Sequence, residues 1–254
     1  MKRIRFLKIL GISAVTAGLM LTAAGLTVQL LLSQNGYTGN VITASEEFET
    51  PRELVVITAS LPITVEYGDV SAVKVDYKGV LPLIFNEDKG TLRITQNDTF
   101  TIDLFSVEAL SSGVNITLPH KTYERISLSS SGGSITSKFL SAGTTEYSTK
   151  GGDMALYGID ERAYVRTESG RIHAEFSSYS ADMTINAGAG DVELLMSPES
   201  SIYLEYFTES GTFTSHSPDR SDESRYGDFV AMYNGAKHKL NVKTTSGSLD
   251  LYLY

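Results

Sequence analysis

The side chains best suited to chemistry in this sequence are its histidines, and their spacing argues against a metal site. They are His120, His173, His216 and His238, and none stands at metal-ligand spacing from another histidine. The sequence contains no cysteine, so it offers neither a thiolate nucleophile nor a cysteine ligand for zinc. We expect surface or loop histidines, and we predict no metal and no cofactor.

A second set of charged residues recurs at a fixed place in a repeat. Asp153, Arg171 and Asp191 each follow a glycine directly and are 18 and 20 residues apart. In stacked strands they would form a column with a spacing of about 5 Å. Two interpretations are open: a calcium column like that of Asp-Gly nonapeptide solenoids, or a ladder of surface ion pairs. Arg171 stands where calcium would need a second acid, which favours the ladder.

Catalytic motifs are missing from the sequence. It contains no Gly-x-Ser-x-Gly elbow, no phosphate-binding Walker loop and no dinucleotide-binding glycine fingerprint. Solenoid enzymes that act on polysaccharides cluster their carboxylates on one sheet between long loops. Here the acids are scattered over the repeats and only one long loop is expected. We therefore predict that the protein is not an enzyme.

The charged column belongs to a four-residue motif that occurs six times in the sequence, always with glycine at its second position. These glycines are Gly133, Gly152, Gly170, Gly190, Gly211 and Gly247, at spacings of 19, 18, 20, 21 and 36 residues. Apolar residues at spacing two precede and follow each glycine, as Val165 and Ile172 do at Gly170. Each unit therefore reads as strand, turn, strand. We expect each glycine to supply a positive φ at a tight corner.

Stacked units of this kind predict an all-β solenoid, similar to a parallel β-helix, with about 18–21 residues per coil. One unit cannot bury its own apolar face, whereas stacked copies can. The regular part begins at about residue 120, and the alternative is an antiparallel sandwich. Residues 51–118 are less regular, with strand-like pairs such as Ile102 and Leu104. They could be opening coils or a cap.

The front of the chain predicts a membrane anchor. Residues 1–8 carry four basic side chains and no acid, and residues 9–32 are almost entirely apolar, which is long enough to span a bilayer. We predict a cytoplasmic tail (1–8), a single-pass anchor (9–32), a polar linker (33–50) and an extracytoplasmic β-repeat domain (51–254) in the cell membrane. A signal peptide cleaved near Ala24 is the alternative.

Charge narrows the possible partners. The chain has 21 basic and 30 acidic residues, and beyond residue 8 the balance is 17 against 30, a net charge of −13. An acidic domain without a basic aromatic groove binds nucleic acid poorly, so we predict that nucleic acid is not a partner.

The long gap between the last two glycines predicts a loop over 216–236 that could contact a partner. Its candidate contact residues are Arg220, Arg225, Tyr226, Phe229 and Tyr233, because aromatic side chains beside arginines commonly anchor a binding surface. The alternative is a solvated insertion whose aromatic side chains pack back on the last two coils.

Two stretches resemble a known family. The run from Val114 to Pro119, followed by Ile126 and the first Ser-Gly-Gly, resembles the core of the bacterial "putative-adhesin" domain, and Val242 to Leu251 resembles its closing repeat. The resemblance covers about 50–254 and implies a β-solenoid of the cell envelope, often behind one transmembrane segment. It supplies no catalytic residues. The Asp or Asn usual after the glycine is Ser, Arg or Thr in four of the six copies.

We accordingly expect an adhesion, scaffold or interaction module of the bacterial envelope. Its partner would be cell-wall polymer, surface polymer or another envelope protein. An accessory or sensor component of an envelope-stress system is the second hypothesis, and a polysaccharide-acting enzyme is the third.

Overall fold

The computed structural model describes residues 41–79, 82–96, 112–159, 161–217 and 220–254. The predicted tail (1–8), the anchor (9–32), the first part of the linker (33–40) and the strand-like pair Ile102 and Leu104 lie outside the described residues. No helix in the described part of the chain is long and apolar enough to cross a membrane.

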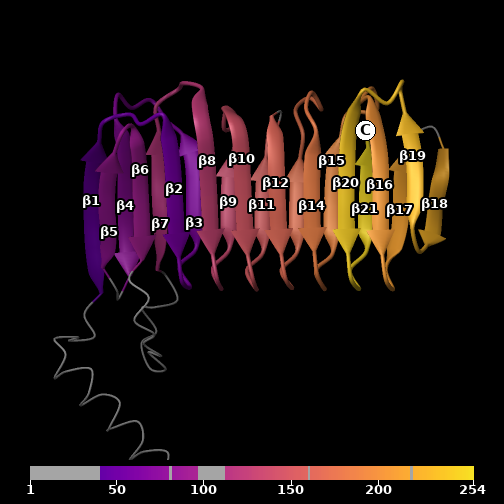
Figure 1. The fold of residues 1–254 in the computed structure, drawn as a ribbon, viewed down its shortest axis with the longest axis horizontal. Coiled ribbons are helices and arrows are strands. Elements are labelled where there is room, and N and C mark those ends of the chain that lie inside the picture. The colour runs from indigo at the N-terminus through magenta and orange to yellow at the C-terminus, as the bar shows by residue number, and fades with distance from the viewer. Residues whose placement is uncertain (1–40, 80–81, 97–111, 160, 218–219) are drawn as a thin grey trace, which may run out of the picture. The chain divides into compact units, whose positions relative to one another are not determined.

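Two long β-sheets make up the described fold (Figure 1). Sheet A has eleven strands, in the order β1 (Ile42–Phe48), β4 (Val73–Gly79), β7 (Gly113–Leu118), β3 (Ile63–Tyr67), β9 (Ile135–Lys138), β11 (Met154–Tyr157), β13 (Ile172–Glu175), β15 (Val192–Met196), β21 (Leu249–Leu253), β17 (Thr212–Ser217) and β18 (Arg220–Tyr226). Sheet B has ten, in the order β19 (Phe229–Tyr233), β16 (Ile202–Thr208), β20 (His238–Thr244), β14 (Met183–Ala187), β12 (Arg162–Thr167), β10 (Ala142–Thr149), β8 (Tyr123–Ser130), β2 (Glu53–Thr58), β6 (Thr91–Gln96) and β5 (Leu83–Asp88).

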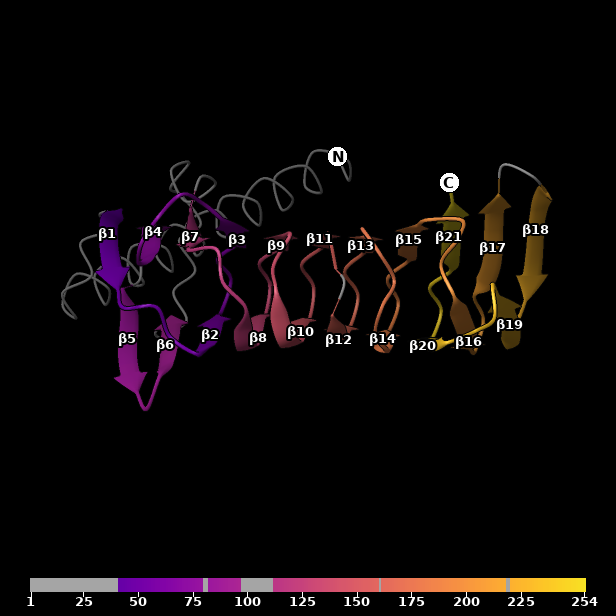
Figure 2. The ribbon, with the colours of Figure 1, turned by 90° about the horizontal axis from the view of Figure 1, so that it is seen from above.

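Each coil contributes one strand to each sheet, so the two sheets lie face to face as two rows (Figure 2). Neighbouring coils pair in parallel and in register, as Met154 with Ile172 in sheet A and Ile185 with Val242 in sheet B. Parallel pairing through the middle of both sheets confirms the predicted all-β solenoid and contradicts the antiparallel sandwich.

The core lies between the two sheets and runs the length of the stack. Alternate residues of each strand face inward, which is why β8, β10 and β12 carry the buried side chains Leu128, Tyr147 and Val165 at equivalent places. Burial of Tyr147 is complete, and its hydroxyl forms a 2.9 Å hydrogen bond with Ser137 of sheet A. The period-two pattern therefore predicted the core-facing residues because each strand has only two faces.

The N-terminal end contains both structures that the sequence left open for 51–118. The strands β2 and β3 form one coil and β6 and β7 form another, and both coils pair in parallel with their neighbours. Beyond them, β4 pairs antiparallel with β7 in sheet A, and β5 pairs antiparallel with β6 in sheet B. Strand β1 in turn pairs antiparallel with β4. The second half of the predicted linker is therefore strand β1, and the β domain begins near residue 42 instead of 51.

At the C-terminal end the spatial order of the coils departs from their order in the sequence. The last coil, β20 and β21, lies between the coil of β14 and β15 and the coil of β16 and β17. The segment predicted as a loop over 216–236 instead forms two antiparallel strands, β18 on β17 and β19 on β16. Polar residues misled the prediction because an edge strand tolerates charge on its exposed side.

Candidate functional site

The six repeated glycines line one column of corners, but for a different reason from the one predicted. None of them has a positive φ; the described glycines that do are Gly90, Gly158, Gly227 and Gly235. A Cβ on Gly152 would instead overlap the carbonyl oxygen of Gly133, and each later corner approaches the one before it in the same way. The column runs Gly133, Gly152, Gly170, Gly190, Gly247, Gly211. The glycines are required because neighbouring coils touch backbone to backbone.

Buried hydroxyls hold these corners from inside. The backbone N–H of Gly170 donates to Oγ1 of Thr167 at 2.9 Å, and Gly152 donates to Thr149 in the same way at 3.0 Å. Both threonines are buried, so the bond satisfies an N–H that water cannot reach. The Gly, Ala or Ser that precedes each of the six glycines is exposed in every copy.

Among the described residues, Asp153, Arg171 and Asp191 form no ladder of side-chain ion pairs; the two aspartates bond backbone N–H groups instead. The Asp153 carboxylate accepts the backbone N–H of Arg171 at 2.8 Å, and Asp191 accepts that of Ser248 at 2.9 Å. The described residues contain no group of three or more metal-ligating side chains placed to hold an ion. The aspartates therefore tie each corner to the next coil.

The residues predicted to contact a partner divide between the surface and the core. Tyr226 is 87% exposed, and the Arg225 guanidinium lies 4.8 Å from the ring centroid of Phe229. Phe229 stacks on the buried Phe213 with ring centroids 4.6 Å apart, and Tyr233 also packs against the core. The side chain of Arg220 is outside the described part. Phe229 and Tyr233 therefore close the end of the core, as the alternative interpretation held.

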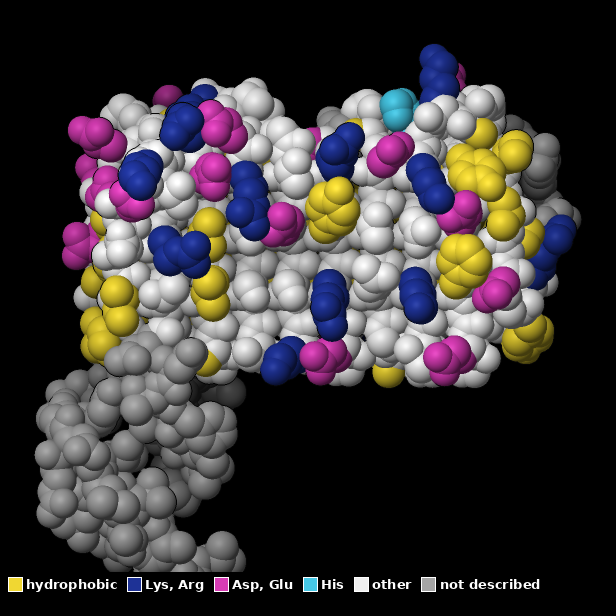
Figure 3. Space-filling model, in the orientation of Figure 1, with side chains coloured by type: hydrophobic (Ala, Val, Ile, Leu, Met, Phe, Trp, Pro, Cys, Tyr) yellow, Lys and Arg dark blue, Asp and Glu magenta, His cyan; other side chains and the backbone are white. Residues whose placement is uncertain are grey.

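Sequence reasoning missed the exposed residues that alternate with these two. Val230 is 52% exposed and Met232 is 71% exposed, both on the outer face of β19. Figure 3 shows apolar side chains gathered at the end of the sheet B face where β16 and β19 lie. The alternation of side chains over 229–233 could have identified these residues as one face of a strand, but the segment was predicted to be part of a loop.

A shallow groove of about 280 Å³ lies on the outer face of sheet B across β12, β14 and β20. It is lined by Arg162, Tyr164, Asp182, Met183, Thr184, Lys239 and Asn241. Tyr164 is 47% exposed, so its ring is open to solvent in the groove. Lys239 and Asn241 bind Glu205 at 2.8 and 3.2 Å. The hydrogen bond to Glu205 raises the pKa of Lys239.

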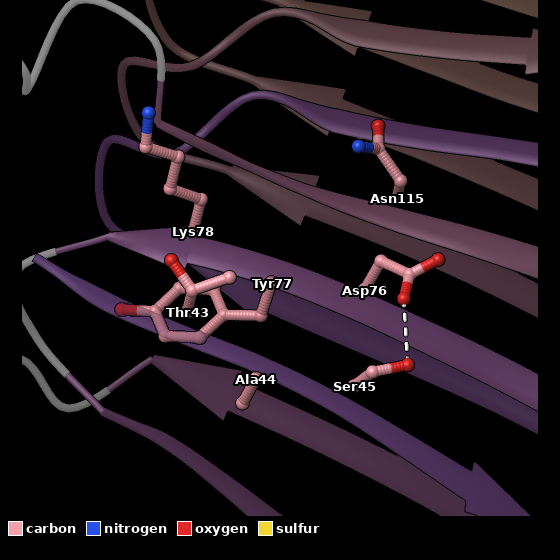
Figure 4. Close-up of a pocket in the computed structure, with 7 residues that line it drawn as sticks. All are labelled: Thr43, Ala44, Ser45, Asp76, Tyr77, Lys78 and Asn115. Atoms are coloured by element: carbon pink, nitrogen blue, oxygen red, sulfur yellow. Dashed lines mark hydrogen bonds between the residues drawn. The ribbon is translucent and has the colours of Figure 1, made fainter.

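A second groove, of about 390 Å³, lies on the outer face of sheet A at the N-terminal end (Figure 4). Its central contact is the hydrogen bond from Ser45 on β1 to Asp76 on β4, at 2.7 Å. That bond, together with Lys74, lowers the pKa of Asp76. Because the carboxylate is already engaged twice and the lining offers no exposed ring, we consider this groove the weaker candidate.

His173 bridges two carboxylates in the structure. Its Nδ1 lies 2.9 Å from Glu193 and its Nε2 lies 3.2 Å from Glu175. Partial burial lowers the pKa of His173, but the bonds to Glu193 and Glu175 outweigh it, so the net pKa is raised. Both ring nitrogens are occupied, which leaves none for a metal or for proton transfer to a substrate.

Comparison with known protein families gives one match, to the model described as Toastrack DUF4097. It matches twice, over residues 52–163 and 161–252, which together cover nearly all of the solenoid. This chain belongs to the Toastrack family. The match agrees with the resemblance to putative-adhesin domains found in the sequence.

Solved structures with a similar arrangement include two from bacteria. One is described as a "putative cell adhesion protein" from Clostridium sporogenes, with 11% identity and a TM-score of 0.48, covering 85% of this chain and 100% of that one. The other is a "putative adhesin" from Bacteroides fragilis, with 10% identity and a TM-score of 0.42, covering 85% and 98%. No curated protein matches the chain in sequence.

Proposed function

We propose that this Toastrack chain is a non-catalytic binding module of the bacterial envelope, held in the membrane by residues 9–32. The basic flank at 1–8, the apolar length of the segment and the acidic balance of the remaining chain support this orientation. The β domain would then stand outside the membrane. Membrane fractions carrying the chain should resist carbonate extraction, and a tag placed after Leu32 should be reachable from outside. Release of a soluble chain that starts near residue 25 would contradict the anchor.

The groove around Tyr164 carries the proposal that the ligand is a cell-wall or surface polysaccharide. An exposed ring offers an apolar face to the C–H groups of a sugar, and polar groups around it can bond the hydroxyls. The side chains of Arg162, Tyr164 and Thr184 form no hydrogen bond or ion pair with the rest of the described chain. They are therefore available to a ligand.

The shape of the surface favours a polymer over a small molecule. Pockets for small ligands are usually enclosed, and they bury most of the surface of what they bind. Here the groove is shallow and lies on the long outer face of sheet B, where strands follow one another side by side (Figure 1). An extended chain could therefore lie across several strands and make weak contacts to each. The summed contacts would supply affinity that one groove cannot.

Binding of the full-length protein to purified, insoluble cell-wall material tests this proposal. Tyr164→Ala removes the ring and should weaken binding about three- to tenfold, the range expected for the loss of one aromatic contact. Phe207→Ala is the matched control, because Phe207 is also an exposed ring on the outer face of sheet B but lies outside the groove. Equal binding by wild type and Tyr164→Ala would contradict the groove as the site.

A further inference from the structure

The four strands at the ends of the two sheets are not equally protected against pairing with another chain. Sheet A ends in β1 and β18, and sheet B ends in β5 and β19. Natural edge strands commonly carry a charge on the core-facing side, which would be buried without a partner if another strand paired there. The positions of charged residues on these strands can therefore be compared directly.

Three of the four edges carry such a charge. On β1, Glu46 pairs with the buried Val75, and on β5, Glu87 pairs with the buried Leu92, so both glutamates lie on the core-facing side. On β18, Arg225 pairs with the buried Phe213. Each of these edges would place a charge inside any continued sheet. They are protected against strand addition.

The edge at β19 carries no charge on either face. Its five residues are Phe229, Val230, Ala231, Met232 and Tyr233. The core-facing residues Phe229, Ala231 and Tyr233 are only partly buried, and the outward Val230 and Met232 are exposed. Its outer side has no neighbouring strand in the described part of the chain. An uncharged, apolar edge of this kind is a surface for strand pairing.

We propose that β19 pairs antiparallel with β19 of a second copy of this chain, which joins two stacks end to end about a two-fold axis. Full overlap of the five residues places Ala231 on the axis and Val230 opposite the second copy's Met232. Apolar side chains then meet on both faces, and no charge on β19 is buried. Only sheet B is continued in this arrangement, because the core-facing Arg225 of β18 opposes the continuation of sheet A.

A head-to-tail assembly is disfavoured by the same residues. It would set β19 against β5 of the next copy and bring Glu87 beside one of the core-facing rings of β19, which itself carries no cation. Burying a carboxylate among apolar side chains is unfavourable. At the ends of sheet B these residues therefore favour a closed dimer over an open filament. This inference does not depend on the proposed polysaccharide site.

The first test measures the oligomeric state of the full chain in detergent by sedimentation. We expect the wild type to be a dimer, and Val230→Lys and Met232→Lys to raise its dissociation constant roughly two- to thirtyfold, because each substitution changes two symmetry-related cross-strand pairs. Both residues are exposed in the single chain, so the variants should keep the circular-dichroism spectrum of the wild type and lose only the part of the melting temperature that depends on dimer concentration. Ile84→Lys is the matched control, since Ile84 is 51% exposed on β5, the other edge of sheet B, and it should leave the dimer intact.

The second test is covalent and uses the absence of native cysteine. Cells that make both Val230→Cys and Met232→Cys chains should yield a disulfide-linked dimer of the two variants, because full overlap places these positions opposite each other. If the register is shifted by two residues, one of the variants should instead form a disulfide-linked dimer on its own. A monomeric wild type would overturn the proposal. A dimer that both lysine variants leave unchanged would also overturn the proposal. So would concentration-dependent assembly into larger oligomers that Ile84→Lys abolishes, or the absence of any disulfide-linked pair.

Discussion

Two adjacent glycines at the second corner give a sharp test of why the repeat keeps its glycine. An added Cβ on Gly152 would overlap the carbonyl oxygen of Gly133 and lie 2.8 Å from the backbone nitrogen of Ser134. An added Cβ on Gly151 would meet nothing closer than Oγ of Ser169, at 3.8 Å. Neither glycine has a positive φ, so the steric contact is the main difference between them.

The magnitude follows from what must move. Forcing an extra carbon into a packed site destabilises a protein by about 1–3 kcal/mol. Because the obstacle at Gly152 is backbone that cannot change rotamer, we expect about 3 kcal/mol for Gly152→Ala. Gly151→Ala should be neutral or stabilise by about 0.4–1 kcal/mol, since alanine has fewer unfolded conformations.

Thermal unfolding of the full-length protein measures the difference. At about 2–4 °C per kcal/mol for a domain of this size, Gly152→Ala should lower the melting temperature by about 6–12 °C. Gly151→Ala should leave it unchanged or raise it slightly. If both variants have the melting temperature of the wild type, the coils do not touch at their corners. If both fall equally, the glycines are needed for backbone conformation, as the sequence alone suggested.

Two further predictions concern the hydroxyl column and the histidine bridge. Thr167→Val removes the acceptor of the buried Gly170 N–H and should lower the free energy of unfolding by about 1–3 kcal/mol, whereas Thr167→Ser should retain most of the stability. Urea unfolding of both variants measures this difference. Equal losses of stability in the two variants would exclude the hydroxyl as the cause. Because bonds to Glu193 and Glu175 raise the pKa of His173, its stabilising contribution should be complete below its ordinary pKa of about 6.5 and disappear as the pH rises through the folded value. The stability difference between wild type and His173→Gln should therefore shrink with rising pH, and a pH-independent difference would contradict the bridge.

The architecture was predictable because it rests on short-range patterns. Alternation of apolar residues identified the core-facing side chains, and the spacing of the glycines identified one corner per coil. The order of the coils was not predictable in this way. Every coil presents the same inward pattern, so Val242 suits a place beside Ile185 as well as a place beyond Tyr206. Only the 36-residue gap hinted at a rearrangement.

The candidate sites were predictable only in part, for a related reason. An aromatic residue on an edge strand can face the core or the solvent, and the choice depends on register. The sequence left open whether Phe229 and Tyr233 contact a partner or pack on the last coils; both face the core, while Met232 between them is exposed. Tyr164 drew no attention in the sequence because its neighbours in the groove, Thr184 and Asn241, come from other coils.

The displaced position of the final coil has a consequence for how the chain acquires its structure. A repeat protein can usually add each unit to the one before it as the chain emerges. Here β16 and β17 dock on β20 and β21, which come later in the chain, and have no pairing with β14 or β15. This end of the stack therefore cannot assemble until β20 and β21 have been synthesised. Until then, the edges of β14 and β15 stay open, and any premature stop in the last coil would detach a whole end of the domain.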